Sequence, residues 1–237
     1  MSSSTVRLVS VLPGLLGTYG DGGNVIVLSR RLSWRGIDSE VLAVGAGEPI
    51  PTSGDIYVLG GGEDDAQVAA LGALRGSALS VAVDRGATVL AVCAGLQLLG
   101  QSLELASGER VSGLGLLDLE TGRLSTRAVG ETIAEPDNTL SLPLLTGFTN
   151  HAGSTHLGTA ARPLGRVLSG PGNGGHGDEQ EGVLQGAIIG SYLHGPLLAR
   201  NPALADLILS RVVGGPLPDL VPGQAEALHD ERINAQR

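Results

Sequence analysis

The chain contains a single cysteine, Cys93, and the residues around it suit a reactive thiol. Residues 88–92 are apolar or β-branched, as expected of a buried parallel strand, and residues 94–99 suit the first turns of a helix. Small residues follow Cys93 at once, so the chain can turn sharply and lift this side chain out of the sheet edge. A free cysteine can also be a buried structural residue, so the rest of the chain decides between these two interpretations.

The predicted helix after Cys93 supplies backbone groups that would assist catalysis. The free N–H groups at the start of a helix point back toward the preceding turn. They favour the thiolate form of Cys93, which is the nucleophilic form of the side chain. The N–H of Ala94 is also placed to bind a developing oxyanion. The local pattern therefore predicts a cysteine nucleophile with part of its oxyanion hole.

A histidine at a comparable position could act as the base. Residues 183–192 form an apolar segment that predicts a buried strand or hairpin, and this segment leads directly to His194. Because Cys93 and His194 both follow apolar strands, we expect them at the same edge of a sheet. His151 and His156 lie in a segment broken by glycines, where solvent-facing or pocket histidines are expected rather than a metal site.

Two glycine-rich segments mark further strand ends. Residues 60–62 are consecutive glycines after a short apolar strand at 55–59, and they would either let the backbone approach a ligand or form a flexible turn. Residues 19–24 read Tyr-Gly-Asp-Gly-Gly-Asn, between a predicted strand at 6–12 and a predicted helix at 25–34. We interpret this second segment as a helix-capping turn, because the lysine that a phosphate-binding loop requires is missing.

Strands and helices alternate along the chain, which predicts an α/β fold with an open, doubly wound, mainly parallel sheet and helices on both faces. The other expected elements are a strand at 39–44, helices at 63–74 and 77–85, and a helix from Asn201-Pro202 to about Val213. The predicted domain spans residues 5–214. Residues 215–237 are rich in prolines and charges and are expected to form a frayed C-terminal tail.

Composition narrows the class of protein. The chain has 237 residues and a formal net charge of −9, and only 2% of its residues are aromatic, which argues against a nucleic-acid partner. The single cysteine excludes an internal disulfide and fits a reducing compartment. The first five residues lack a signal-peptide pattern and no apolar run is long enough to span a membrane, so we expect a cytoplasmic protein.

Taken in order, these motifs resemble those of class I glutamine amidotransferases. The turn at 92–97, Val-Cys-Ala-Gly-Leu-Gln, and the segment Tyr-Leu-His-Gly at 192–195 are typical of the cobyric acid synthase-like branch. Three further segments, at 19–24, 60–64 and 147–153, resemble those of the stand-alone glutaminase subunits of lipid II isoglutaminyl synthases. The resemblance covers nearly the whole predicted domain and implies the same flavodoxin-like α/β fold.

The resemblance implies hydrolysis of L-glutamine by a Cys–His pair. Cys93 would attack the side-chain amide, His194 would take and return the proton, and water would hydrolyse a glutamyl thioester. Gly62 and Ala94 would supply the N–H groups of the oxyanion hole. The implied glutamine-binding residues are Gly61, Gln97, Arg127, Asn150 and His151. Of these, Arg127 is expected to hold the α-carboxylate of glutamine.

One position departs from the triad found in many members of the family. Those members carry a glutamate two residues after the histidine, where this chain has Pro196. A histidine without an orienting acid is a weaker base. We therefore expect a partner subunit to supply an acidic side chain or otherwise to fix His194.

The resemblance also implies an ammonia acceptor on another chain. No nucleotide-binding loop is recognisable, so no cofactor is expected on this chain, and ATP and Mg²⁺ are expected on a Mur-ligase-like partner. That partner would amidate the D-glutamate of the lipid II stem peptide to D-isoglutamine, within a hetero-oligomer at the cytoplasmic face of the membrane. The alternatives are a glutaminase for a cobyric acid synthase-like or other biosynthetic acceptor, and a catalytically silent scaffold subunit.

Overall fold

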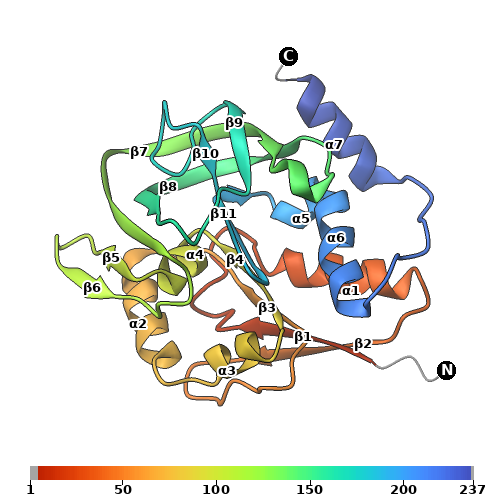
Figure 1. The fold of residues 1–237 in the computed structure, drawn as a ribbon, viewed down its shortest axis with the longest axis horizontal. Helices are drawn as coiled ribbons and strands as arrows, with labels where there is room; N and C mark the ends of the chain where they lie inside the picture. Colours follow the sequence, from red (N-terminus) through yellow and green to blue (C-terminus); the bar gives the residue numbers. More distant parts are fainter. Residues whose placement is uncertain (1–4, 236–237) are drawn as a thin grey trace.

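The computed structural model describes residues 5–235 and confirms an α/β fold built on a parallel sheet (Figure 1). The six strands of this sheet lie in the order β11-β12-β4-β3-β1-β2, and all neighbours are parallel except β11 and β12. Their bounds are β1 Val6–Val11, β2 Ser39–Val44, β3 Ile56–Leu59, β4 Thr88–Val92, β11 Val183–Gln185 and β12 Ile188–Ser191. The first four residues, which contribute to the argument against a signal peptide, lie outside the described part.

Burial explains why the central strands appear in the sequence as continuous apolar runs. Every residue of β3, β4 and β12 is buried, as expected of parallel strands that are covered on both faces. The outer strand β2 has mostly exposed side chains. In Figure 1, helices α2 (Asp64–Leu74) and α3 (Leu79–Asp84) lie on one side of the strands, and α1 (Gly23–Ser33) and α6 (Pro202–Val213) lie on the other. The doubly wound arrangement predicted from the sequence is therefore confirmed.

Helix α6 spans the residues that its sequence predicts, but the expected cap, Asn201, does not cap it. Helix α6 has Pro202 at its first position and ends at Gly214, whose φ of 78° is left-handed. Asn201 precedes the helix, but its side chain accepts from Thr146 N and donates to Thr146 O, both at 2.8 Å, instead of capping the helix. The short helices are α4 Ala94–Leu99 and α5 Leu197–Arg200. Among the described helices, none is both long and apolar enough to cross a membrane.

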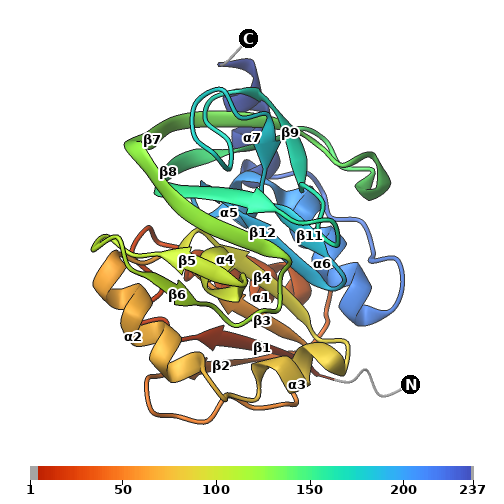
Figure 2. The same ribbon diagram turned by 60° about the vertical axis from the view of Figure 1, so that its left-hand side comes forward.

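A second, mainly antiparallel sheet was not predicted from the sequence. Its long strands β7 (Leu119–Pro136) and β8 (Leu145–Leu157) pair with each other, and Figure 2 shows them above strands β1 to β4. The shorter strands are β5 Ser102–Glu104, β6 Arg110–Ser112, β9 Gly165–Ser169, β10 Gln180–Glu181 and β13 Leu193–His194. Strand β13 follows β12 of the parallel sheet and pairs with β8, so the two sheets meet at His194.

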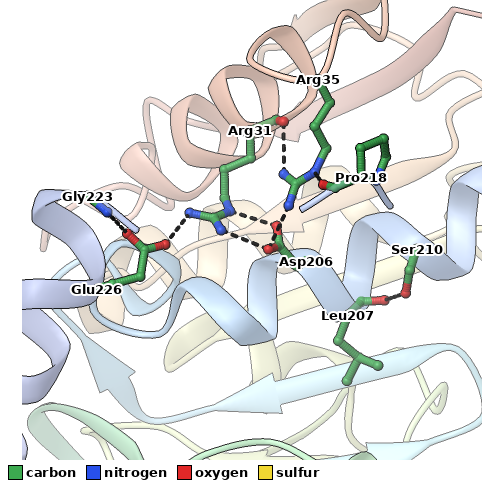
Figure 3. A network of polar contacts seen from close by, with 8 residues as sticks. All are labelled: Arg31, Arg35, Asp206, Leu207, Ser210, Pro218, Gly223 and Glu226. Atoms are coloured by element: carbon green, nitrogen blue, oxygen red, sulfur yellow. Dashed lines mark hydrogen bonds and ion pairs between the residues drawn. The ribbon is translucent and has the colours of Figure 1, made fainter. Parts of the chain in front are cut away.

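The C-terminal segment forms a docked helix, α7 (Gln224–Asn234), so the expectation of a frayed tail is wrong for this segment. Arg31 of α1 donates two hydrogen bonds of 2.7 Å to Asp206 of α6 and one of 3.1 Å to Glu226 of α7 (Figure 3). Arg35 also donates to Asp206, at 2.8 Å. Of these contacts, the one between Arg31 and Glu226 ties α7 to the domain. The helix also buries His229 and Ile233, and His229 Nε2 lies 2.8 Å from the carbonyl oxygen of Leu144. Because these contacts need no long apolar face, the low hydrophobicity of the segment misled the prediction.

Candidate active site

Cys93 occupies the turn between β4 and α4, as the sequence predicts. Its backbone has φ 51° and ψ −109°, a conformation that is rare for any residue other than glycine. The Cys93 N–H donates to the carbonyl of Ser191 in β12 at 2.8 Å, so the turn is fixed to the neighbouring strand. The residue is 5% exposed and lines a pocket. A strained turn that presents a thiol to a pocket favours a nucleophile over a structural cysteine.

The three glycines after β3 lie beside this turn. The carbonyl of Gly60 accepts from Gly95 N at 3.1 Å, which joins the β3 loop to α4. Gly62 lines the pocket with Cys93. Within residues 5–235, neither the Gly62 N–H nor the Ala94 N–H donates a hydrogen bond, so both are available to a ligand. This arrangement supports the predicted oxyanion hole.

Gly61 lies against Asp21 and His194 and does not line the pocket. Its N–H donates to Asp21 Oδ2 at 2.8 Å, which removes it from the groups available to glutamine. A Cβ atom at Gly61 would lie 3.0 Å from His194 Cε1 and 3.1 Å from Asp21 Oδ2. Glycine is needed here because the backbone passes directly against the imidazole and the carboxylate.

His194 has an acidic partner within its own chain. Its Nδ1 lies 3.1 Å from Asp21 Oδ1 and 3.2 Å from Asp21 Oδ2, and both side chains are buried. Its other nitrogen, Nε2, is buried and has no hydrogen-bond partner among the described residues. The expectation that a partner subunit must supply the orienting acid is therefore wrong, because Asp21 already occupies that position.

The electrostatics of His194 favour its protonated form. Burial alone would lower the pKa of His194, but the hydrogen bond with Asp21 and the nearby Cys93 side chain raise it to about 9. Cys93 is thus close enough to affect the imidazole, although the two side chains do not form a hydrogen bond of normal geometry. Such contacts are often loose before substrate binds.

Strand order explains how Asp21, which is 173 residues away in the sequence, reaches His194. The loops after β1, β3, β4 and β12 all leave the carboxyl edge of the parallel sheet, where they become neighbours. The loop after β1 is also packed tightly, because a Cβ at Gly23 would lie 2.3 Å from Pro196 Cγ, and Asn24 Oδ1 accepts from Leu198 N at 2.9 Å. Asp21 lies in the loop that follows β1, and this position alone predicts that it lies at the same sheet edge as Cys93. The interpretation of residues 19–24 as a helix-capping turn did not use this signal.

The antiparallel sheet supplies the opposite wall of the site. Arg127 lies at an irregularity of β7, opposite β8. Its Nε donates to Asn150 Oδ1, and its Nη2 donates to Tyr19 Oη at 2.8 Å. Arg127 and Asn150 both line the pocket that contains Cys93. The structure therefore brings these two sequence-predicted residues to the nucleophile.

Gln97 of α4 and His151 of β8 are buried residues that line the pocket. Gln97 accepts from Gln67 Nε2 at 2.6 Å and donates to Tyr192 Oη at 2.9 Å. The His151 ring stacks on Tyr192 at 3.8 Å, and its two nitrogens face the carbonyls of Gly153 and Gly172. Burial lowers the pKa of His151 to about 4, so the ring is neutral and donates to only one of these carbonyls. These contacts fix both residues as parts of the pocket wall.

The pocket over Cys93 is small. Its volume is about 30 Å³, which is far below the several hundred Å³ typical of ligand sites. Its lining residues are Tyr19, Gly62, Glu63, Asp64, Gln67, Cys93, Gln97, Glu104, Thr121, Arg123, Arg127, Asn150, His151, Ala152 and Gly153. A larger cleft of about 340 Å³ lies between α1, α6 and the C-terminal segment, but none of these residues lines it.

Comparison with known proteins identifies the family of the chain. Residues 8–202 match the model of the CobB/CobQ-like glutamine amidotransferase domain. The chain is 34% identical over 201 residues to the lipid II isoglutaminyl synthase (glutamine-hydrolyzing) subunit GatD of Staphylococcus aureus (strain N315), covering 83% of this chain and 79% of that protein. It is 35% identical over 206 residues to the GatD subunit of Streptococcus pneumoniae (strain ATCC BAA-255 / R6), covering 84% and 77%.

Two further similarities concern longer or more distant proteins. The cobyric acid synthase of Sphingopyxis alaskensis is 35% identical over 185 residues, which is 73% of this chain but 35% of that protein. A solved structure of a glutamine amidotransferase superposes with a TM-score of 0.58 at 20% identity, covering 87% of this chain and 98% of the other, and it supports the fold alone. The family match and the relatives of similar length show that this chain belongs to the CobB/CobQ-like glutamine amidotransferase family.

Proposed function

We propose that this chain is the glutaminase subunit of a lipid II isoglutaminyl synthase. The observation that carries the proposal is the buried line of Asp21, His194 and Cys93 beside a pocket that contains Arg127. Relatives that cover about four-fifths of the chain bear the name of such a subunit. The chemistry is acyl transfer to a cysteine, followed by hydrolysis.

The first half of the reaction releases ammonia. At neutral pH His194 carries a proton, since its pKa is raised to about 9, and this positive charge lies close to Cys93, whose thiolate is the attacking form. The thiolate attacks the side-chain amide carbon of glutamine, and the N–H groups of Gly62 and Ala94 hold the resulting oxyanion. His194 then gives its proton to the amide nitrogen, the C–N bond breaks, and ammonia leaves a γ-glutamyl thioester on Cys93.

The second half regenerates the enzyme. Neutral His194 takes a proton from a water molecule, whose oxygen attacks the thioester carbon. The C–S bond breaks, glutamate leaves, and Cys93 returns to the thiolate beside protonated His194. Throughout both halves Asp21 holds Nδ1 of the imidazole, so that Nε2 faces the reacting atoms.

Ammonia must reach an acceptor on a second protein. We propose a Mur-ligase-like, ATP- and Mg²⁺-dependent partner that activates the α-carboxyl of D-glutamate in the lipid II stem peptide and accepts the ammonia. The two subunits would form a hetero-oligomer in the cytoplasm and contribute to peptidoglycan synthesis. Two relatives from different bacteria are each named as a subunit of a lipid II isoglutaminyl synthase, which supports an assembly of this kind.

The test measures both products in one experiment. The chain is incubated with L-glutamine alone, and then with the Mur-ligase-like protein from the same cell, ATP, Mg²⁺ and lipid II. We expect glutamate and ammonia in the first setting, and amidated stem peptide detected by mass spectrometry in the second. Ammonia release without amidation would favour another biosynthetic acceptor, such as that of a cobyric acid synthase-like enzyme. No ammonia in either setting would refute the glutaminase and leave a silent scaffold.

A further inference from the structure

One tyrosine hydroxyl links two opposite charges at the mouth of the pocket. Tyr19 Oη donates to Glu63 Oε1 at 2.9 Å and accepts from Arg127 Nη2 at 2.8 Å. Burial and the hydrogen bond to Glu63 raise the pKa of Tyr19, so its hydroxyl keeps the proton that it donates. All three residues line the pocket that contains Cys93. The hydroxyl therefore sits between a carboxylate and a guanidinium directly beside the nucleophile.

This contact also joins the two halves of the site. Tyr19 and Glu63 follow β1 and β3 of the parallel sheet, whereas Arg127 belongs to β7 of the antiparallel sheet. The Tyr19 ring packs against His194, with their centroids 4.7 Å apart. The pocket beside this bridge has a volume of about 30 Å³, which is too small for a glutamine molecule.

We propose that Glu63 and Arg127 together bind the α-ammonium and α-carboxylate groups of glutamine. In the free protein the Tyr19 hydroxyl occupies the position of these groups, and the substrate displaces it. The inference deepens the proposed glutaminase function and rests on it. The α-ammonium of glutamine would donate to Glu63, and the α-carboxylate would accept from Arg127. Glu63 is thus the specificity residue that the sequence did not reveal, and Tyr19 is the gate.

The chemistry of the displaced group supports this assignment. The Tyr19 hydroxyl donates to Glu63 and accepts from Arg127. The α-ammonium of glutamine would donate to Glu63 in the same way, and its α-carboxylate would accept from Arg127. Tyr19 lies beside open space, because a Cβ at the neighbouring Gly20 would meet nothing within 4 Å. Displacement of Tyr19 would open the pocket toward Cys93 while Arg127 keeps its contact with Asn150.

The test measures glutamine binding to the full chain carrying Cys93→Ala, which prevents turnover. Isothermal titration calorimetry compares L-glutamine with glutaramate, the analogue that lacks the α-amino group. We expect Glu63→Gln to weaken L-glutamine binding about tenfold and to reduce the preference for L-glutamine over glutaramate by a similar factor. We expect Tyr19→Phe to strengthen L-glutamine binding about threefold or more, because the substrate no longer competes with the hydroxyl.

The matched control is Asp65→Asn, which removes the same charge two residues further along, on an exposed position outside the pocket. Its affinity for L-glutamine should equal that of the Cys93→Ala parent. The inference is overturned if Glu63→Gln leaves the preference unchanged, or if Tyr19→Phe weakens binding. If the Cys93→Ala parent binds L-glutamine, and Glu63→Gln and Tyr19→Phe bind it as tightly as Asp65→Asn does, only this inference is refuted. A parent that binds no L-glutamine refutes the proposed function as well.

Discussion

The two halves of the active site are built in different ways. Cys93 and Asp21 lie in turns after strands of the parallel sheet, and His194 lies where the chain passes from β12 to the antiparallel sheet; all three are at most 5% exposed. On the antiparallel sheet, Arg127 is exposed and is held by side-chain contacts alone. The backbone topology therefore positions the residues that we propose for catalysis, whereas side-chain contacts position the residue that we propose for glutamine recognition. Changes in the two halves should therefore affect different kinetic constants.

The largest effect is expected at the nucleophile. Cys93→Ala removes the atom that forms the thioester, so ammonia release should fall by at least about 10³-fold. The fold should be retained, which circular dichroism and the melting temperature would check. A variant that keeps most of its ammonia release would remove Cys93 from the mechanism.

Asp21→Asn should show that the chemical half is complete within this chain. The amide cannot hold the imidazole in the same way as a carboxylate, so we expect kcat/KM to fall about 10²- to 10⁴-fold. KM for glutamine should change little, because Asp21 does not line the pocket. Asp38→Asn, at an exposed position, is the control. Wild-type kcat in Asp21→Asn would return the orienting role to a partner subunit.

The same variant should change the pH dependence of stability. The folded-state pKa of His194, about 9, lies above its ordinary value of 6.5, so the charge interactions stabilise the fold fully below pH 6.5. This contribution is lost as the pH rises through 9. Urea unfolding of the wild type should therefore show a fall in stability over this window, and Asp21→Asn should show a smaller fall. Equal falls would contradict the Asp21–His194 interaction.

A variant at Glu181 tests the segment where the chain passes from the parallel sheet to the antiparallel sheet. This fully buried side chain of β10 accepts from Ser191 Oγ at 2.9 Å and from Tyr192 N at 2.8 Å, just before His194. Burial raises the pKa of Glu181 from 4.5 to about 7, so its contribution to stability is present below pH 4.5 and lost as the pH rises through 7. Glu181→Gln should remove a loss on the order of 3 kcal/mol between pH 4.5 and 8. Parallel stability curves for variant and wild type would contradict this account.

The recognition half should give the smallest effect and a different kinetic signature. Arg127→Ala removes the proposed partner of the glutamine α-carboxylate, so we expect KM to rise about tenfold or more while kcat changes less. Arg110→Ala, an exposed arginine of β6 outside the pocket, is the control. An unchanged KM would exclude Arg127 from substrate binding.

This division also determines what the sequence could reveal. The strand before Cys93 and the strand before His194 are continuous apolar runs, so the parallel sheet and the residues at its edge could be predicted. The strands β7 and β8 mix charged, polar and small residues, and their pairing has a register shift between Arg123 and Ala128. The antiparallel sheet therefore left no local pattern strong enough to predict.

Asp21 and the C-terminal helix were missed for related reasons. The role of Asp21 depends on a contact across 173 residues, and its glycine-rich surroundings have a simpler interpretation as a turn. The topology rule that gathers strand-end residues at one sheet edge also applies to the loop after β1, and it would have found this carboxylate. Helix α7 is anchored in part by an ion pair between Glu226 and Arg31, which hydrophobic periodicity does not detect.

We expect this chain to hold its nucleophile, base and orienting acid without a partner subunit. The most direct test exposes the chain alone to 6-diazo-5-oxo-L-norleucine, a glutamine analogue with an electrophilic diazoketone, and follows the intact mass. We expect a single adduct on Cys93 that L-glutamine prevents, and a rate at least about tenfold lower in Asp21→Asn. Labelling of another residue, or equal rates in wild type and Asp21→Asn, would contradict the account.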